Sequence, residues 1–175
     1  MGWLLMTYRL AGGGSSARVA VWREVRRSGA LQLQQSVVAF PDDEAFARAV
    51  ERLRALVSEV GGETLVVRAE PLAAADGAQL LDAWNEARAA EYAELASECE
   101  KFLAEIDHEF EIGKFTLAEL DEEESAFERL QSWHERIVGR DLHGASGSED
   151  AAAALEQAQV ALDRYSTAVF ERTAP

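Results

Sequence analysis

The sequence predicts an α+β protein with a small mixed domain over residues 1–75 and an acidic helical module over residues 76–175. Three observations support this. Short apolar runs alternate with amphipathic stretches in the first part, whereas the second part shows only helical spacing of apolar side chains. The charge also changes, from nine arginines and eight acids in residues 1–75 to eight bases and 24 acids in residues 76–175. Such a charge asymmetry favours two modules.

The first part has the element order βαββαβ, which is that of a ferredoxin-like fold. Strands are predicted over residues 3–8, 31–34, 37–40 and 64–67. Helices are predicted up to Gly29 and up to Gly61, where glycine can take the left-handed conformation that ends a helix. Two right-handed crossovers then place the first and third strands in the middle of the sheet. On the apolar stripes of the two helices, we expect Trp22 and Leu53 to be buried.

Side chains that cap helices mark several of these boundaries. Ser15 or Ser16 is expected to cap the first helix, after the glycine run 12–14, and Asp42 or Asp43 the second. In the second part, Thr116 begins a capping box with Glu119.

Three helices are predicted in the second part: one over residues 77–111, one from the capping box to Gly139, and one after the polar loop 144–148. In the first of these, apolar residues repeat about every 3.5 positions, and Arg88 is the one charged residue on that seam. We expect Arg88 to pair with a carboxylate or to mark a break in the helix near residues 88–90. The acidic run 121–124 is interpreted as a water-facing cluster near a helix N-terminus.

Composition excludes several classes of protein. The chain has 32 acids and 17 bases, for a net charge of −15, so its surface as a whole is not expected to bind nucleic acid. A single cysteine excludes an internal disulfide and a cysteine-rich zinc site. No apolar run approaches the roughly 18 residues of a membrane span, and the apolar start is too short for a signal peptide. We therefore expect a cytoplasmic protein that makes no membrane contact.

Arginines in the first part form the main candidate site. Arg23, Arg26 and Arg27 share one face of the first helix, Arg18 lies in its first turn, and Arg9 ends the first strand. Guanidinium groups match phosphates and oxyanions, so these five residues are a candidate site for DNA or an oxyanion. The alternative is a solvated helix face, partly paired with Glu24 and with acids of the second module.

No residues point strongly to catalysis. Glu105 and His108 form one Glu-x-x-His motif, but the di-iron bundles that use this motif need two copies. Cys99 lies on the apolar seam, where a buried thiol stays inert. We expect no catalytic residues, no metal and no cofactor, and hence a protein that is not an enzyme.

A family resemblance adds to this interpretation. The chain resembles the N-terminal domain of the chromate resistance protein ChrB in several segments that occur in the same order: WLL at 3–5, YRL at 8–10, RVAVWREVRRSGA at 18–30, LQ at 33–34, FPD at 40–42, EYAEL at 91–95, KFTLAEL at 114–120 and RD at 140–141. The resemblance implies a bacterial regulator that represses a chromate efflux operon and responds to chromate.

The first half also resembles, more distantly, the ferredoxin-like domain of PaaX repressors and of CRISPR adaptation nucleases. Those nucleases bind a metal through an aspartate at the end of the first strand, where this sequence has Tyr8, Arg9 and Leu10. A metal-dependent nuclease is thus the less favoured alternative. The favoured hypothesis is a regulatory or interaction module that binds DNA or chromate, forms a homodimer, or contacts a protein partner through its helices.

Overall fold

The computed structural model describes residues 2–10 and 14–173 of the chain. The chain divides into two compact units, Met1–Trp84 and Asn85–Pro175, and each is described by itself. The elements are β1 (Trp3–Arg9), α1 (Ser15–Ser28), β2 (Leu31–Gln34), β3 (Val37–Pro41), α2 (Glu44–Glu59), β4 (Glu63–Ala69), α3 (Ala74–Ile112), α4 (Leu117–Val138) and α5 (Ser148–Thr173). The predicted α+β class and the order βαββαβ are confirmed.

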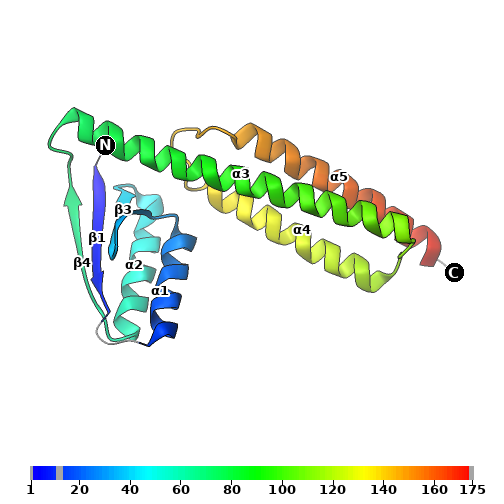
Figure 1. Ribbon diagram of the computed structural model, residues 1–175, viewed down its shortest axis with the longest axis horizontal. Coiled ribbons are helices and arrows are strands. Elements are labelled where there is room, and N and C mark those ends of the chain that lie inside the picture. Colours follow the sequence, from blue (N-terminus) through cyan, green and yellow to red (C-terminus); the bar gives the residue numbers. More distant parts are fainter. Residues whose placement is uncertain (1, 11–13, 174–175) are drawn as a thin grey trace. The chain divides into compact units, whose positions relative to one another are not determined.

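The first unit contains one antiparallel sheet with the strand order β2-β3-β1-β4, so β1 and β3 are central as predicted. Figure 1 shows α1 and α2 together on one face of this sheet. Met6 lies opposite Val38 on one side and Val66 on the other, and it is fully buried in the core that the two helices cover. Because side chains alternate along a strand, Leu65 and Val67 lie on the other face, where both are exposed.

The core of this unit confirms one of the two predicted burials. Leu53 of α2 is fully buried, whereas the indole of Trp22 is 50% exposed, so that prediction is wrong. Val21 and Val25 of α1 are the residues that pack into the core. A residue one position further along an α-helix lies about 100° further round it, which turns Trp22 away from the sheet when Val21 faces it.

Most helix ends follow the predicted signals. The Asp43 side chain accepts a hydrogen bond from the Ala45 amide at 2.9 Å, and the Thr116 hydroxyl accepts one from Glu119. Gly29 ends α1 with a positive φ of 70°. The serine cap is wrong: Gly14 occupies the N-cap position of α1, and no side chain caps this end. Of the glycine run 12–14, the first two residues lie outside the described part of the chain.

The three predicted helices of the second part are confirmed, and α3 is one unbroken helix of 39 residues. The break proposed near Arg88 is therefore wrong, whereas the proposed pairing with a carboxylate is right, because the Arg88 guanidinium lies 3.1 Å from Glu91. Two apolar clusters hold the second unit together, one around Phe102, Phe127 and Tyr165 and the other around Tyr92 and Ile137. Among the described residues, no helix is long and apolar enough to span a membrane.

The different positions of Leu53 and Trp22 lead to a direct test of the first core. We expect Leu53→Ala to lower the free energy of unfolding by about 2–5 kcal/mol, because it leaves a cavity between α2 and the sheet. Trp22→Ala is the matched control and should cost about 1 kcal/mol or less, as is typical of an exposed position with one cation–π contact. Denaturant melts of the two variants measure both changes, and losses of equal size would contradict this packing.

Candidate functional site

The outward side of α1 combines arginines with exposed apolar side chains. Val19, Trp22, Arg23 and Arg26 lie on this side, Arg18 is in the first turn of the helix and nearer the Val25 side, and all five are exposed. We call these five residues the basic face. The Arg26 guanidinium lies 5.3 Å from the centre of the Trp22 ring, which is a cation–π distance. The basic face thus offers cations and a large apolar surface on one helix.

The acid of α1 is turned away from the basic face. Glu24 is the single carboxylate in this helix, and it is only 8% exposed. Its two carboxylate oxygens accept hydrogen bonds from Arg27 at 2.9 Å and from Arg52 of α2 at 3.4 Å. Because α1 buries Glu24 on its inner side, this helix adds no negative charge to its outer side.

The five arginines of the predicted site do not form one group. Arg18, Arg23 and Arg26 are in the basic face, with their side chains in water. Arg27 lies at the side of the helix and is paired with Glu24 at 2.8 Å. Arg9 ends β1 and forms an exposed ion pair of 2.7 Å with Glu63 of β4. Arg18, Arg23 and Arg26 are therefore the arginines whose charge is best placed to attract a phosphate or another oxyanion.

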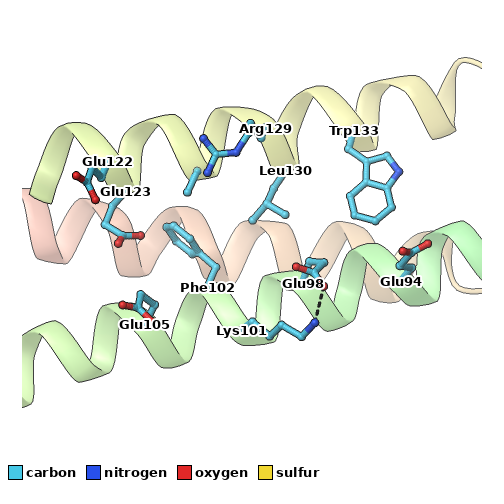
Figure 2. Close-up of a pocket in the computed structure, with 11 residues that line it drawn as sticks. Glu94, Glu98, Lys101, Phe102, Glu105, Glu122, Glu123, Arg129, Leu130 and Trp133 are labelled. Atoms are coloured by element: carbon cyan, nitrogen blue, oxygen red, sulfur yellow. Dashed lines mark hydrogen bonds and ion pairs between the residues drawn. The ribbon is translucent and has the colours of Figure 1, made fainter. Parts of the chain in front are cut away.

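A groove between α3 and α4, which the sequence analysis missed, is the second candidate site. It has a volume of about 590 Å³ and is entirely in the second unit. Figure 2 shows side chains of both helices directed toward it, with Phe102, Leu130 and Trp133 as its main apolar residues. We call it the α3/α4 groove.

The edges of the α3/α4 groove are mostly acidic. Five carboxylates and two cations line it, an excess of three negative charges. Lys101 is already paired with Glu98 at 2.5 Å. The remaining charged side chains are Glu94 and Glu105 of α3 and Glu122, Glu123 and Arg129 of α4. The groove is therefore suited to a ligand that has both apolar and cationic groups.

Carboxylates crowd at one end of this groove. Glu123 is 7% and Glu109 3% exposed, so the prediction that the whole run 121–124 faces water is wrong at Glu123. Burial raises the pKa of the Glu123 carboxyl, and nearby acids raise it further. These acids are Glu105 and Glu109 of α3 and Glu119 and Glu122 of α4, while Tyr165 of α5 and Lys114 also lie in this region.

The raised pKa of Glu123 gives a pH-dependent prediction. The folded protein holds the proton of this group more tightly than the unfolded chain, so the ionised carboxylate destabilises the fold as the pH rises. We expect Glu123→Gln to increase the free energy of unfolding at pH 7, and this gain to disappear near pH 4, below the usual pKa of a glutamate. Melts of wild type and variant across this range measure the difference.

The neighbouring Glu124 provides the control for this experiment. It is exposed, and the change to Gln has the same chemistry. We expect Glu124→Gln to leave the pH dependence of stability close to that of the wild type. A gain of equal size in both variants would show that net charge, rather than the burial of Glu123, causes the effect.

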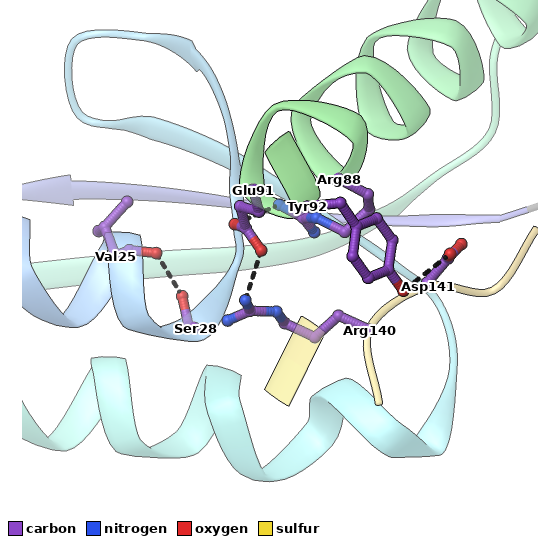
Figure 3. Close-up of polar contacts among 7 residues, drawn as sticks. All are labelled: Val25, Ser28, Arg88, Glu91, Tyr92, Arg140 and Asp141. Carbon is purple, nitrogen blue, oxygen red and sulfur yellow. Dashed lines mark hydrogen bonds and ion pairs between the residues drawn. The ribbon is translucent and has the colours of Figure 1, made fainter. Parts of the chain in front are cut away.

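Buried charges join α3 to the end of α4. Arg88 is only 2% exposed, and Glu91 accepts hydrogen bonds from both Arg88 and Arg140, at 3.1 and 2.5 Å (Figure 3). The Tyr92 hydroxyl donates to Asp141 at 3.2 Å, and burial together with Asp141 raises its pKa to about 12. Two arginines face two carboxylates in this network, so its charge is balanced.

Removal of Arg88 should therefore be costly. We expect Arg88→Ala to lower the free energy of unfolding by about 3 kcal/mol, near the lower end for a broken buried pair, because Arg140 still neutralises Glu91. Arg136→Ala on the exposed side of α4 is the control and should change stability by about 0–1 kcal/mol. If both variants unfold at the wild-type denaturant midpoint, the network contributes nothing to the free energy of unfolding.

The other candidates for chemistry do not form a site. His108 lies 3.9 Å from Glu111, and no group of three or more histidine, cysteine, aspartate or glutamate residues in the described part of the chain is arranged to hold a metal ion. Cys99 is buried, and burial raises the pKa of its thiol. The basic face and the α3/α4 groove therefore remain as the two candidate sites.

The fold defines a class of protein, an α+β sheet unit followed by a three-helix unit. The family described as "Protein ChrB, N-terminal" matches residues 18–175. The chain therefore belongs to the ChrB N-terminal family, and the predicted resemblance is confirmed. No curated protein matches the chain significantly.

Proposed function

We propose that the protein is a non-catalytic regulatory module and that the basic face of α1 binds the phosphate backbone of DNA. The observation that carries this proposal is the arrangement of charge on α1. Arg18, Arg23 and Arg26 are exposed on this helix, while its single acid, Glu24, is buried on the inner side. Arginine side chains are among the groups that contact DNA phosphates.

The geometry of an exposed helix suits DNA in particular. The major groove of B-DNA admits an α-helix, and guanidinium groups bind phosphate oxygens with two parallel hydrogen bonds. Trp22 lies between the arginines and adds an apolar surface that can pack against sugars. Since the whole chain has a net charge of −15, most of it in residues 76–175, the chain as a whole repels DNA, so we expect modest affinity.

Family membership is the second support for a regulatory role. The resemblance to ChrB implies a repressor that responds to chromate, and chromate is an oxyanion like phosphate. The same three arginines are therefore the proposed contacts for chromate, which would compete with DNA for them. This is the simplest route by which an oxyanion could release such a protein from its operator.

The competing hypothesis is a metal-dependent nuclease on the same scaffold. The nucleases that the first half resembles bind the metal through an aspartate at the end of the first strand, where this chain has Arg9, and the adjacent carboxylate of Glu63 is paired with this arginine. A stoichiometric divalent metal in the purified protein would favour the nuclease over the proposed role.

Salt dependence of DNA binding tests the proposal. Three phosphate contacts predict that affinity for the DNA upstream of its own gene falls about 40-fold between 50 and 200 mM salt. The change of Arg18, Arg23 and Arg26 to Glu should abolish binding without loss of the fold, since all three are exposed. Fluorescence anisotropy measures the affinity, and added chromate should lower it in the wild type.

A second triple variant separates a specific face from overall charge. Arg9, Arg54 and Arg68 are exposed, lie outside α1, and each is in a surface ion pair. Their change to Glu alters the net charge by the same amount but should weaken binding far less than the triple change in α1. If both triple variants lose the same DNA affinity, the loss is caused by net charge, and DNA binding is not assigned to α1.

A further inference from the structure

We propose that the α3/α4 groove is the docking site for α1 of a second copy of this chain. The inference concerns the same helix face as the proposed function, but it does not depend on DNA binding. It starts from the helical unit, where α4 and α5 pack along each other while α3 and α4 leave a groove of about 590 Å³. A helix in this groove would turn three long helices into a four-helix arrangement.

The side chains of the groove define the helix that fits it. Phe102, Leu130 and Trp133 provide apolar contacts, and the surrounding glutamates favour cations. The occupant is thus an amphipathic helix with apolar and basic groups on one face. Helices that bind in grooves present their contact residues at positions i, i+3, i+4 and i+7.

The basic face of α1 has this pattern and this chemistry. Val19, Trp22, Arg23 and Arg26 occur at i, i+3, i+4 and i+7, and all are exposed. Val19 is 41% and Trp22 50% exposed, which is a large apolar surface for an outward helix face. Trp and Arg are also among the residue types enriched at the positions that dominate binding energy in interfaces.

The charges of the two surfaces are complementary. The groove has an excess of three negative charges, and the basic face has three arginines, including Arg18. Glu123 lies buried among Glu105, Glu109, Glu119 and Glu122, and although Lys114 pairs with Glu119, like charges still repel one another there. A guanidinium at this end of the groove would offset that repulsion, which favours a cationic occupant over an apolar one.

A second copy is an occupant that the chain itself supplies. Each copy carries one basic face and one groove, so a reciprocal dimer makes the contact twice. Two equal contacts add in free energy, and association can therefore occur even if each contact is weak.

Charge reversal in matched pairs tests this dimer. The face variant changes Arg23 and Arg26 to Glu, and the groove variant changes Glu105 and Glu122 to Lys, all at exposed positions. Sedimentation equilibrium at concentrations up to about 1 mM, the scale of weak association, measures the dimer. We expect a wild-type dimer that weakens with salt, and each variant alone to associate at least tenfold more weakly.

The decisive sample is an equimolar mixture of the two variants. The reversed helix of one variant is complementary to the reversed groove of the other, and the two remaining wild-type surfaces also match. We therefore expect the mixture to recover association to within a few-fold of the wild type. As a control, the change of Glu156 and Glu171 to Lys on α5, outside the groove, should leave the dimer intact.

Several results would overturn the proposal. They are a wild-type monomer at every concentration, variants that associate like the wild type, and a mixture that fails to recover. Association that survives both reversals would point to another surface, such as the open sheet face with Leu65 and Val67. DNA binding gives a separate outcome, because the groove variant should keep it while the face variant should lose it.

Discussion

The burial of Val21 and Val25 against the sheet decides which side of α1 meets water. These two side chains fix the rotation of the helix, and every other position follows from the helical repeat. Glu24 then lies inside, where Arg27 and Arg52 neutralise it, and Arg23, Arg26 and Trp22 lie outside. The candidate binding surface is thus a consequence of how the core of the first unit is packed.

A similar relation between packing and charge holds in the helical unit. The apolar seam of α3 includes Arg88, which is retained inside because Glu91 and Arg140 complete a balanced network. The charges are not balanced in this way near Glu123, at one end of the α3/α4 groove, where Glu109 and Glu123 are buried among further glutamates. The acidic end of the unit is therefore the place where a cationic ligand would gain most from electrostatics.

The fold is well predicted from the sequence because the signals for its helices and strands are local. Strands, glycine and aspartate caps and the seam of α3 each depend on residues within a few positions of one another. The pattern alone cannot decide whether Val21 or Trp22 is buried, because the apolar stripe of α1 is short and these two residues are adjacent. The structure decides, with Val21 in the core and Trp22 in water.

The candidate sites were harder to predict because they depend on contacts between distant residues. Arg9 forms an ion pair with Glu63, which lies 54 residues later in the sequence, and therefore does not join the other arginines of the predicted site. No local sequence pattern reveals this ion pair. The α3/α4 groove did leave a signal in the sequence. Glu94, Glu98, Lys101 and Glu105 recur at helical spacing beside the seam, which marks a charged edge on one side of α3. The opposite edge of the groove, on α4, is recognised only in the structure, where α3 and α4 lie side by side.

In the two proposals, the same arginines bind two alternative anionic ligands, the phosphates of DNA and the glutamates of the groove. A helix face that occupies the groove of a second copy cannot contact DNA at the same time, so each ligand lowers the apparent affinity for the other. The loss depends on protein concentration, because dimer formation removes free α1 by mass action. Salt screens both contacts, so ionic strength alone cannot separate them. Separation requires a change in the groove, which is the one surface that dimerisation uses and DNA binding does not.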